Sequence, residues 1–201
     1  GKPIILSTGM ASLSEIDKAV ELLNKRKCTD IALLHCISIY PPLYEDIHLN
    51  NISTLQKAFG VPIGFSDHTI GFSIPLASVA LGSCIIEKHF TTDKNLPGWD
   101  HMISADPTEM KIICEESTKI STSMGSFSRV VSQAEEEKKF KFRRSVVAKK
   151  TLHAGHILTN DDLTSKRPGT GISPDMINHL IGRKLKRNVE EDVLLKWEDV
   201  Y

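Results

Sequence analysis

Two histidines, His68 and His89, each stand at the end of an apolar run, "VPIGFSDH" and "CIIEKHF". They are 89 − 68 = 21 residues apart, a spacing typical of one strand, one helix and their connecting loops. If the two runs are neighbouring parallel strands, both imidazoles can reach one ion, and imidazole suits Mn, Fe, Zn and other divalent metals. The spacing is equally compatible with two polar residues that simply begin loops.

Acidic and hydroxyl side chains accompany this pair. Asp67 and Glu87 adjoin the histidines and could orient a ligand imidazole or transfer a proton, or they could be ordinary salt-bridge partners at a rim. Ser7, Ser38 and Ser66 stand at strand ends, where hydroxyl and amide groups can donate to a phosphate or a carboxylate. Serine also terminates strands without any further role.

Two more side chains have rigid surroundings. Tyr40 precedes Pro41 and could pack as a rim aromatic or touch a substrate. Arg167 lies in "KRPGTG", where proline and glycine fix the loop and provide a firm mount for recognising a carboxylate or an amide oxygen. An ordinary surface arginine is the alternative interpretation.

Four apolar runs, each followed by a helical pattern, would position these residues. The runs are uniformly apolar, which is typical of parallel strands covered by helices. The polar clusters "STG", "HCIS", "SDH" and "EKH" all occur at the carboxyl ends of their runs, as on the catalytic face of a (β/α) barrel. A complete barrel needs eight units. An open doubly wound sheet is the alternative, but no GxGxxG turn supports a dinucleotide site in it.

The chain changes character after residue 131. Residues 132–139, "SQAEEEKK", have no apolar face and indicate a linker or a solvated helix. Residues 140–201 contain short strand-like pieces, "SVVAKK", "HILT", "GRKLKR" and "DVLL", between glycine turns. We therefore predict a domain of four βα units over 1–131, a linker over 132–139 and a small α+β or β-clip domain over 140–201.

Bulk composition excludes several classes of function. The 201 residues carry 25 basic and 25 acidic side chains, so no electrostatic footprint indicates a nucleic acid or an anionic membrane. No apolar run approaches the roughly 20 residues of a membrane span. The four cysteines have no CxxC spacing and predict reduced, buried thiols in a cytoplasmic protein. The start "GKPIILSTG" has no signal-peptide pattern and enters a buried strand at once, unlike a natural beginning.

The combined motifs resemble one known family. "ILSTGM", "LLHCISIYP", "GFSDHT" and "IIEKHFT", followed by "RRSVVAKK", "GHILTNDDL" and "KRPGTGISP", closely resemble the sialic acid synthases. This family comprises N-acetylneuraminate, legionaminic acid and pseudaminic acid synthases with an antifreeze-like (SAF) carboxyl-terminal domain. The resemblance covers essentially the whole chain but only part of the family's length. It implies the last four βα units of a TIM-type barrel followed by a SAF domain.

The resemblance implies a metal enzyme that condenses phosphoenolpyruvate with an open-chain N-acylated amino sugar of the N-acetylmannosamine type. The metal is usually Mn²⁺, with Mg²⁺ as the alternative. The family's metal-binding histidines match His68 and His89. Its serines that contact phosphoenolpyruvate match Ser7 and Ser66. Ser38 stands where several members carry asparagine, which leaves the amide contact of those members open here.

The same resemblance implies further roles. Tyr40 agrees with the family, Glu87 matches its strand-end acid, and Asp100 of "GWDH" matches a loop aspartate near the sugar, so these three are the predicted catalytic residues. Arg167 corresponds to an arginine that the tail domain places over the partner's active site to hold the N-acyl group. The resemblance thus implies a homodimer.

One part of the family's site has no counterpart in this chain. The lysines that bind phosphoenolpyruvate lie on earlier strands of the family's barrel. We therefore expect the polypeptide to be inactive alone unless an amino-terminal half is supplied by another chain or two halves pair. The competing hypothesis is a non-catalytic sugar-binding or assembly module.

Overall fold

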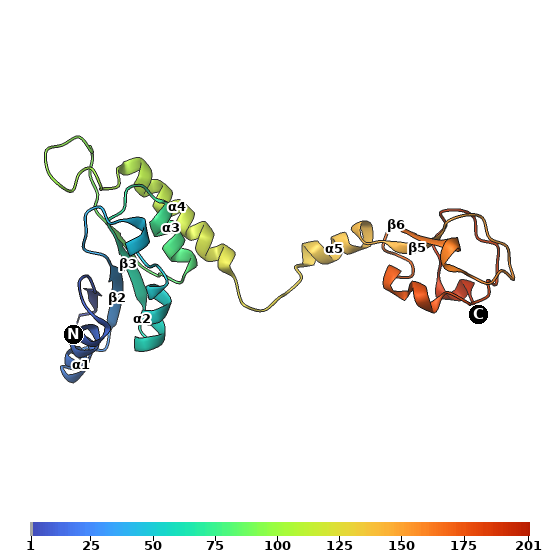
Figure 1. Ribbon diagram of the computed structural model, residues 1–201, viewed down its shortest axis with the longest axis horizontal. Coiled ribbons are helices and arrows are strands. Elements are labelled where there is room, and N and C mark those ends of the chain that lie inside the picture. Colours follow the sequence, from blue (N-terminus) through green and yellow to red (C-terminus); the bar gives the residue numbers. More distant parts are fainter. Residues whose placement is uncertain (1) are drawn as a thin grey trace. The chain divides into compact units, whose positions relative to one another are not determined.

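The computed structural model describes residues 2–201, which form two compact units that divide between Ser126 and Phe127. The first unit is a sheet of four parallel strands in the order β1-β2-β3-β4 (Figure 1). Its strands are β1 (Ile4–Ser7), β2 (Ile31–Cys36), β3 (Ile63–Asp67) and β4 (Ile86–Lys88). Its helices are α1 (Leu13–Lys25), the short 3₁₀ helix η1 (Tyr44–Asp46), α2 (Asn51–Phe59), α3 (Ser73–Ala80) and α4 (Pro107–Met124). The predicted half barrel of four βα units is confirmed.

Local sequence signals fix the helix ends. α4 begins with a capping box, in which the Glu109 amide donates to Asp106 Oδ1 at 2.8 Å and Pro107 occupies the first turn. α2 is capped at its carboxyl end by Gly60, whose φ of 63° is left-handed and costs glycine no strain. The turn at Gly60 returns the chain to the sheet as β3, which runs parallel to β2, so both strands end at the same edge.

The core of the first unit lies between the sheet and its helices. Figure 1 shows α2, α3 and α4 on one side of the sheet. The buried apolar residues of this layer are Ile16, Val20, Ile31, Leu33, Ile47, Ile52, Leu55, Ile63 and Phe65. The other face is partly uncovered, and Ile5 on β1 is 58% exposed there. Gly64 on this face is required, because a Cβ atom would meet Leu34 Cδ2 at 2.4 Å.

The second unit is a small β structure with one helix. It contains α5 (Gln133–Phe142), β5 (Ser145–Ala148) and β6 (Leu163–Lys166), the strands pairing antiparallel, and the 3₁₀ helices η2 (Asn160–Asp162), η3 (Pro174–His179) and η4 (Trp197–Asp199). The predicted strands "HILT" and "DVLL" form only isolated bridges. Gly155 and Gly182, with φ of 89° and 83°, turn the chain before longer ladders can form.

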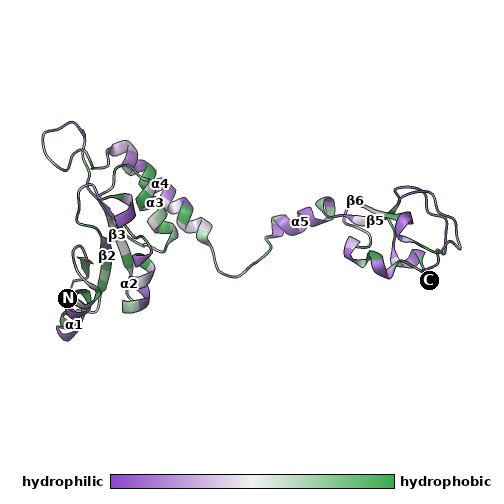
Figure 2. Cartoon of the chain, in the orientation of Figure 1, coloured by the Kyte–Doolittle hydropathy of each residue, from purple (hydrophilic) through white to green (hydrophobic). Residues whose placement is uncertain are grey.

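The charged segment between the predicted domains is helical. α5 begins after Ser132, whose hydroxyl accepts from the Glu135 amide at 3.2 Å. Figure 2 shows it hydrophilic along most of its length. The sequence predicts a linker or a solvated helix for residues 132–139, and the structure shows a solvated helix there. Residues 2–201 form no helix with the length and apolarity that a membrane crossing requires.

The cysteines are all free thiols, but they are less buried than predicted. Only Cys36 is buried, whereas Cys84 and Cys114 are exposed. Both exposed thiols line an open groove of about 840 Å³ between the β4 region and α4. The apolar runs around them predict burial, and the open side of the half barrel is the reason that they remain accessible.

A buried aspartate organises the second unit. Asp162 is 2% exposed and pairs with Lys150 at 2.9 Å and His156 at 2.8 Å, while the Thr159 amide and hydroxyl also donate to it. Burial alone would raise the pKa of Asp162, but the hydrogen bonds from His156, Lys150 and Thr159 hold it far below its usual range.

Replacing Asp162 with asparagine is expected to lower the free energy of unfolding of this unit by about 2–3 kcal/mol at pH 7. Because the folded pKa of Asp162 is depressed, its contribution is fully present above the unfolded pKa of about 3.9 and is lost as the pH falls toward the folded pKa. The difference in free energy of unfolding between the parent chain and Asp162→Asn should therefore become smaller as the pH falls. Denaturant unfolding followed by Trp197 fluorescence in a Trp99→Phe background reports this unit alone.

The matched control for this experiment is Asp161→Asn, which changes the same charge at an exposed neighbouring position. Asp161→Asn should unfold like the parent chain. A stability of Asp162→Asn equal to that of this control would show that the buried network does not contribute.

Candidate active site at the carboxyl ends of the strands

The site is built on the register between β3 and β4. Ser66 pairs with Glu87 and Asp67 with Lys88, so the 21-residue spacing of the two histidines continues this register by one more residue. Side chains alternate along a strand, so Ser66 and Glu87 share the face of the histidines that follow. The Ser66 hydroxyl donates to Glu87 Oε1 at 2.7 Å, and the imidazole centroids of His68 and His89 are 5.3 Å apart.

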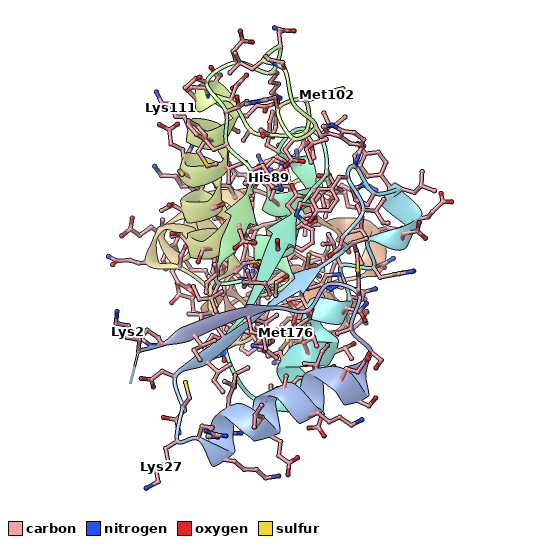
Figure 3. The ribbon with its side chains drawn as sticks, turned by 90° about the vertical axis from the view of Figure 1, so that its left-hand side faces the viewer. Lys2, Lys27, His89, Met102, Lys111 and Met176 are labelled. Atoms are coloured by element: carbon pink, nitrogen blue, oxygen red, sulfur yellow. The ribbon has the colours of Figure 1, made fainter. Side chains whose placement is uncertain are left out.

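These strand ends enclose a small cavity. Its volume is about 190 Å³, and it is lined by Ser66, Asp67, His68, Glu87, Lys88 and His89. The ring of Tyr40 covers the histidines, with centroid distances of 4.0 Å to His68 and 5.9 Å to His89. Figure 3 shows His89 at the end of its strand, with the loop that carries Met102 beyond it. The structure thus brings together five predicted site residues.

The imidazole of His68 has a defined orientation. Its Nδ1 lies 2.8 Å from the carbonyl oxygen of Ile37, and because a carbonyl only accepts, Nδ1 carries the proton. Nε2 is then the ring nitrogen that remains for a partner on the Cys36 side. Burial lowers the pKa of His68, but hydrogen bonds to Cys36 and Ile37 outweigh it and raise this pKa above its ordinary value.

Cys36 lies among the predicted site residues, although the sequence analysis predicts only a buried thiol there. Burial raises the pKa of its thiol, but a hydrogen bond with His68 and others with the hydroxyls of Ser7, Ser38 and Ser66 lower it to about 7. A signal was available in the alternation along β2 and beyond it, since Cys36 and Ser38 are two residues apart and so share a face. Ser7, Ser38 and Ser66 are therefore gathered around one sulfur atom.

Gly9 makes room for this cluster. A Cβ atom at Gly9 would lie 2.1 Å from Ser38 Oγ and 3.2 Å from Cys36 Sγ. Any side chain there would push the Ser38 hydroxyl away, so the "STG" motif after β1 contributes space as well as donors. The Thr8 hydroxyl of the same motif donates to the Leu34 carbonyl at 2.8 Å and fixes the loop to β2.

Asp100, another predicted catalytic residue of the first unit, lies outside the lining of the cavity. It is exposed on the loop between β4 and α4, and its carbonyl accepts from the Ser104 amide at 3.0 Å and the Ser104 hydroxyl at 2.6 Å. The backbone of Asp100 is thus anchored while its carboxylate stays at the surface.

Asp67 and Glu87 have different surroundings. Asp67 is buried and pairs with Lys88 at 2.6 Å. Of the roles predicted for Asp67, its contacts match the salt-bridge partner. Glu87 is exposed at the open face and accepts the Ser66 hydroxyl. Glu87 is therefore the carboxylate of the cavity that is accessible to a ligand.

Arg167 belongs to the second unit. Its guanidinium carbon lies 5.4 Å from the centroid of the Phe142 ring, and the Gly169 amide donates to the Phe140 carbonyl at 2.8 Å. A Cβ atom at Gly169 would meet Arg143 Cβ at 2.6 Å, so the loop packs closely on the end of α5. Arg167 is exposed, and within residues 2–201 no carboxylate pairs with it. The Arg167 guanidinium is thus held against Phe142 and has no carboxylate partner among the described residues.

The residues present fit a divalent metal in part. His68 and His89 offer two imidazoles on one cavity, and the hydrogen bond from His68 to a backbone carbonyl is the support that ligand histidines generally have. Over the described part of the chain, no three or more His, Cys, Asp and Glu side chains surround one potential metal position. This chain therefore offers a two-histidine site with room for further ligands.

Known proteins share both units of the chain. Residues 1–129 match the NeuB family and residues 143–200 match the SAF domain. An uncharacterized protein of Methanocaldococcus jannaschii is 46% identical over 100% of this chain and 59% of its own length. The N,N'-diacetyllegionaminic acid synthase of Campylobacter jejuni is 43% identical over 97% of this chain and 59% of its own.

A solved structure agrees with these relatives. The crystal structure of N-acetylneuraminic acid synthetase from Leptospira borgpetersenii has a TM-score of 0.63 and 43% identity, over 68% of this chain and 47% of that chain. The chain spans about 59% of the length of the curated relatives named above. With a half barrel that ends in this site and a SAF domain after it, the chain belongs to the NeuB family of sialic acid synthases.

Proposed function

We propose that the chain is the carboxyl-terminal part of a synthase that condenses phosphoenolpyruvate with an N-acylated amino sugar and releases phosphate. The product is a nonulosonic acid of the sialic acid type, and the sugar is of the N-acetylmannosamine type. The observation that carries this proposal is the convergence of two imidazoles, a carboxylate and a serine hydroxyl on one cavity at the strand ends. The Campylobacter jejuni and Leptospira borgpetersenii relatives are named as synthases of such acids, which supports the same reaction here.

In this proposal His68 and His89 hold a divalent cation, Mn²⁺ or alternatively Mg²⁺. Such a cation, when bound, supplies Lewis acidity toward the carbonyl oxygen of the open-chain sugar. The hydroxyls of Ser7, Ser38 and Ser66 donate to the phosphate and carboxylate oxygens of phosphoenolpyruvate. Their gathering around Cys36 supports this role, because three donors on one small surface suit an anion with several oxygens.

The condensation forms one carbon–carbon bond and breaks one bond to phosphate. The methylene carbon of phosphoenolpyruvate attacks the sugar carbonyl carbon, and the carbonyl oxygen takes up a proton. Water adds to the neighbouring carbon and loses a proton, and phosphate then leaves. Glu87 is the accessible carboxylate of the cavity and accepts the proton of the water in this proposal. Asp100 on its loop assists near the sugar, and Tyr40 covers the reacting atoms.

Arg167 recognises the N-acyl oxygen, and a homodimer supplies it to the partner's site. Its exposure, its stacking on Phe142 and its lack of a carboxylate partner within residues 2–201 support a role in binding a group from outside its own unit. The balanced charge of the chain gives no reason to add a nucleic acid or a membrane as a partner. Four free thiols favour a reducing, cytoplasmic location.

A synthase assay on a completed barrel tests this function. The chain is combined with the amino-terminal part of the Campylobacter jejuni relative, and phosphate release is measured with phosphoenolpyruvate, Mn²⁺ and N-acetylmannosamine or its diacetamido analogues. Turnover should require both substrates, and Glu87→Gln should lower kcat by about 10²- to 10⁴-fold. Glu137→Gln on α5 is the control for the loss of one carboxylate, and its kcat should be unchanged.

The competing function is a non-catalytic module for sugar binding or assembly. The uncovered inner face of the sheet favours it, because Ile5 and Glu87 are exposed there. The family's lysines that bind phosphoenolpyruvate, which lie on earlier strands, also match no residue of this chain. Sugar binding without phosphate release by the completed barrel would select this alternative and contradict the synthase proposal.

A further inference from the structure

A buried ion pair lies directly behind the two histidines. Lys88 Nζ is 2.6 Å from Asp67 Oδ2, and the two side chains are 1% and 0% exposed. Asp67 immediately precedes His68 and Lys88 immediately precedes His89, so the pair joins the two strands at the last step before the imidazoles. Because neighbouring side chains alternate, the pair lies on the face of the sheet opposite to Ser66 and Glu87.

The same pair closes a turn around His68. Asp67 Oδ1 accepts from the Thr69 amide at 2.9 Å, and Asp67 Oδ2 accepts from the Thr69 hydroxyl at 3.1 Å. Lys88 Nζ also donates to the Thr69 carbonyl at 2.6 Å. The residues on both sides of His68 are therefore held by the residue that precedes His89. His89 itself is anchored through its carbonyl, which accepts from the Ala105 amide at 2.7 Å.

Stability alone does not account for this arrangement. Burying two charges carries a desolvation penalty that their attraction often only offsets, and apolar replacements of such pairs are commonly neutral or stabilising. A geometric role fits better. β4 has only three residues, Ile86–Lys88, so its backbone ladder gives little protection against a slip of one residue, which would move His89 to the other face.

We propose that the Asp67–Lys88 ion pair, with Thr69, is a positioning device that sets the separation and orientation of the His68 and His89 imidazoles for one divalent cation. This inference rests on the proposed metal site. Asp67 and Lys88 do not bind the cation; they act through the histidines, as outer partners of metal ligands do. The affinity of the site for the cation therefore depends on the register of β3 and β4 that the pair maintains.

The test is a metal titration of the 201-residue chain, with free Mn²⁺ followed by electron paramagnetic resonance and folding followed by circular dichroism and thermal unfolding. Lys88→Met leaves Asp67 unpaired, and the double variant Asp67→Asn/Lys88→Met removes both charges with similar side-chain volumes. We expect Mn²⁺ affinity to fall by about 10- to 100-fold in both variants. The double variant should keep the thermal stability of the parent chain.

The control is the pair Lys94–Glu109, which lies in the same unit, is separated by 2.5 Å and is 27% and 19% exposed. Lys94→Met/Glu109→Gln removes the same charges and keeps a side chain that can complete the capping box of α4. Its Mn²⁺ affinity should equal that of the parent chain. A folded Asp67→Asn/Lys88→Met variant with the parent affinity would overturn the proposal.

Thr69→Val decides the question if neither charge variant folds. It is nearly isosteric and removes only the hydroxyl donor to Asp67, and it should weaken Mn²⁺ binding without a change in fold. Parent affinity in this variant would then overturn the inference. A parent chain whose Mn²⁺ binding does not depend on His68 and His89 would instead show that the proposed metal site is wrong, so the two failures are distinct.

Discussion

Replacing His68 and His89 together with alanine is expected to abolish measurable Mn²⁺ binding by the chain. The two imidazoles lie 5.3 Å apart on one cavity, and the described residues provide no group of three or more candidate ligands that could substitute for them. Loss of an outer partner of a ligand costs about 10- to 100-fold in affinity, so loss of both proposed ligands should exceed about 100-fold. Titration with Mn²⁺ and detection of the free ion measures this change.

A matched control separates loss of the site from loss of imidazole in general. His153→Ala/His179→Ala removes two exposed histidines from the second unit and should leave Mn²⁺ binding as it is in the parent chain. Equal binding by the His68→Ala/His89→Ala variant and this control would refute the assignment of the metal ligands.

The second large effect concerns the chain by itself. We expect no synthase turnover from the 201 residues alone with Mn²⁺, phosphoenolpyruvate and N-acetylmannosamine. The sheet has unpaired edges at β1 and β4, and its inner face is partly open, with Ile5 more than half exposed. Reaction requires both substrates to be held in place, which is worth about 7–11 kcal/mol in well-oriented reactions. A half barrel with this open face is not expected to supply that constraint for both substrates.

Addition of an amino-terminal half as a separate polypeptide should restore turnover in a concentration-dependent way. The unmatched part of the Campylobacter jejuni relative is a suitable donor, because the chain covers 59% of that protein. Phosphate release during titration of the donor is the measurement, with the donor alone as the control. Robust turnover by the isolated chain would contradict the expectation.

Much of the first unit could be predicted from the sequence. Apolar runs such as Ile31–Leu34 alternate between faces yet stay largely buried in the structure, and this pattern is typical of parallel strands covered by helices. Because parallel strands have their carboxyl ends at the same edge of the sheet, the polar residues that follow the runs lie close together there. The meeting of Ser66, Glu87 and the two histidines follows from that rule, while the metal itself stays a prediction.

Other features depend on tertiary contacts that have no local signal. Lys88 is an ordinary charged residue in the sequence, and only pairing with Asp67 across the strands makes its burial acceptable. Cys36 became part of the site because Gly9 admits Ser38 beside it. In the second unit, short apolar pieces such as "DVLL" resemble strands, yet the turns around them allow only single bridges.

The register of β3 and β4 has an evolutionary consequence. The tripeptides Ser66–His68 and Glu87–His89 face each other residue by residue, and their mutual contacts need little beyond two adjacent parallel strands. The helix and loops between them can change in length without moving the imidazoles, provided that the register is kept. These six residues, with the backbone contacts to Ile37, Thr69 and Ala105, form a compact unit that protein engineers could graft onto adjacent strands of another barrel and that natural selection could retain while the surrounding loops diverge.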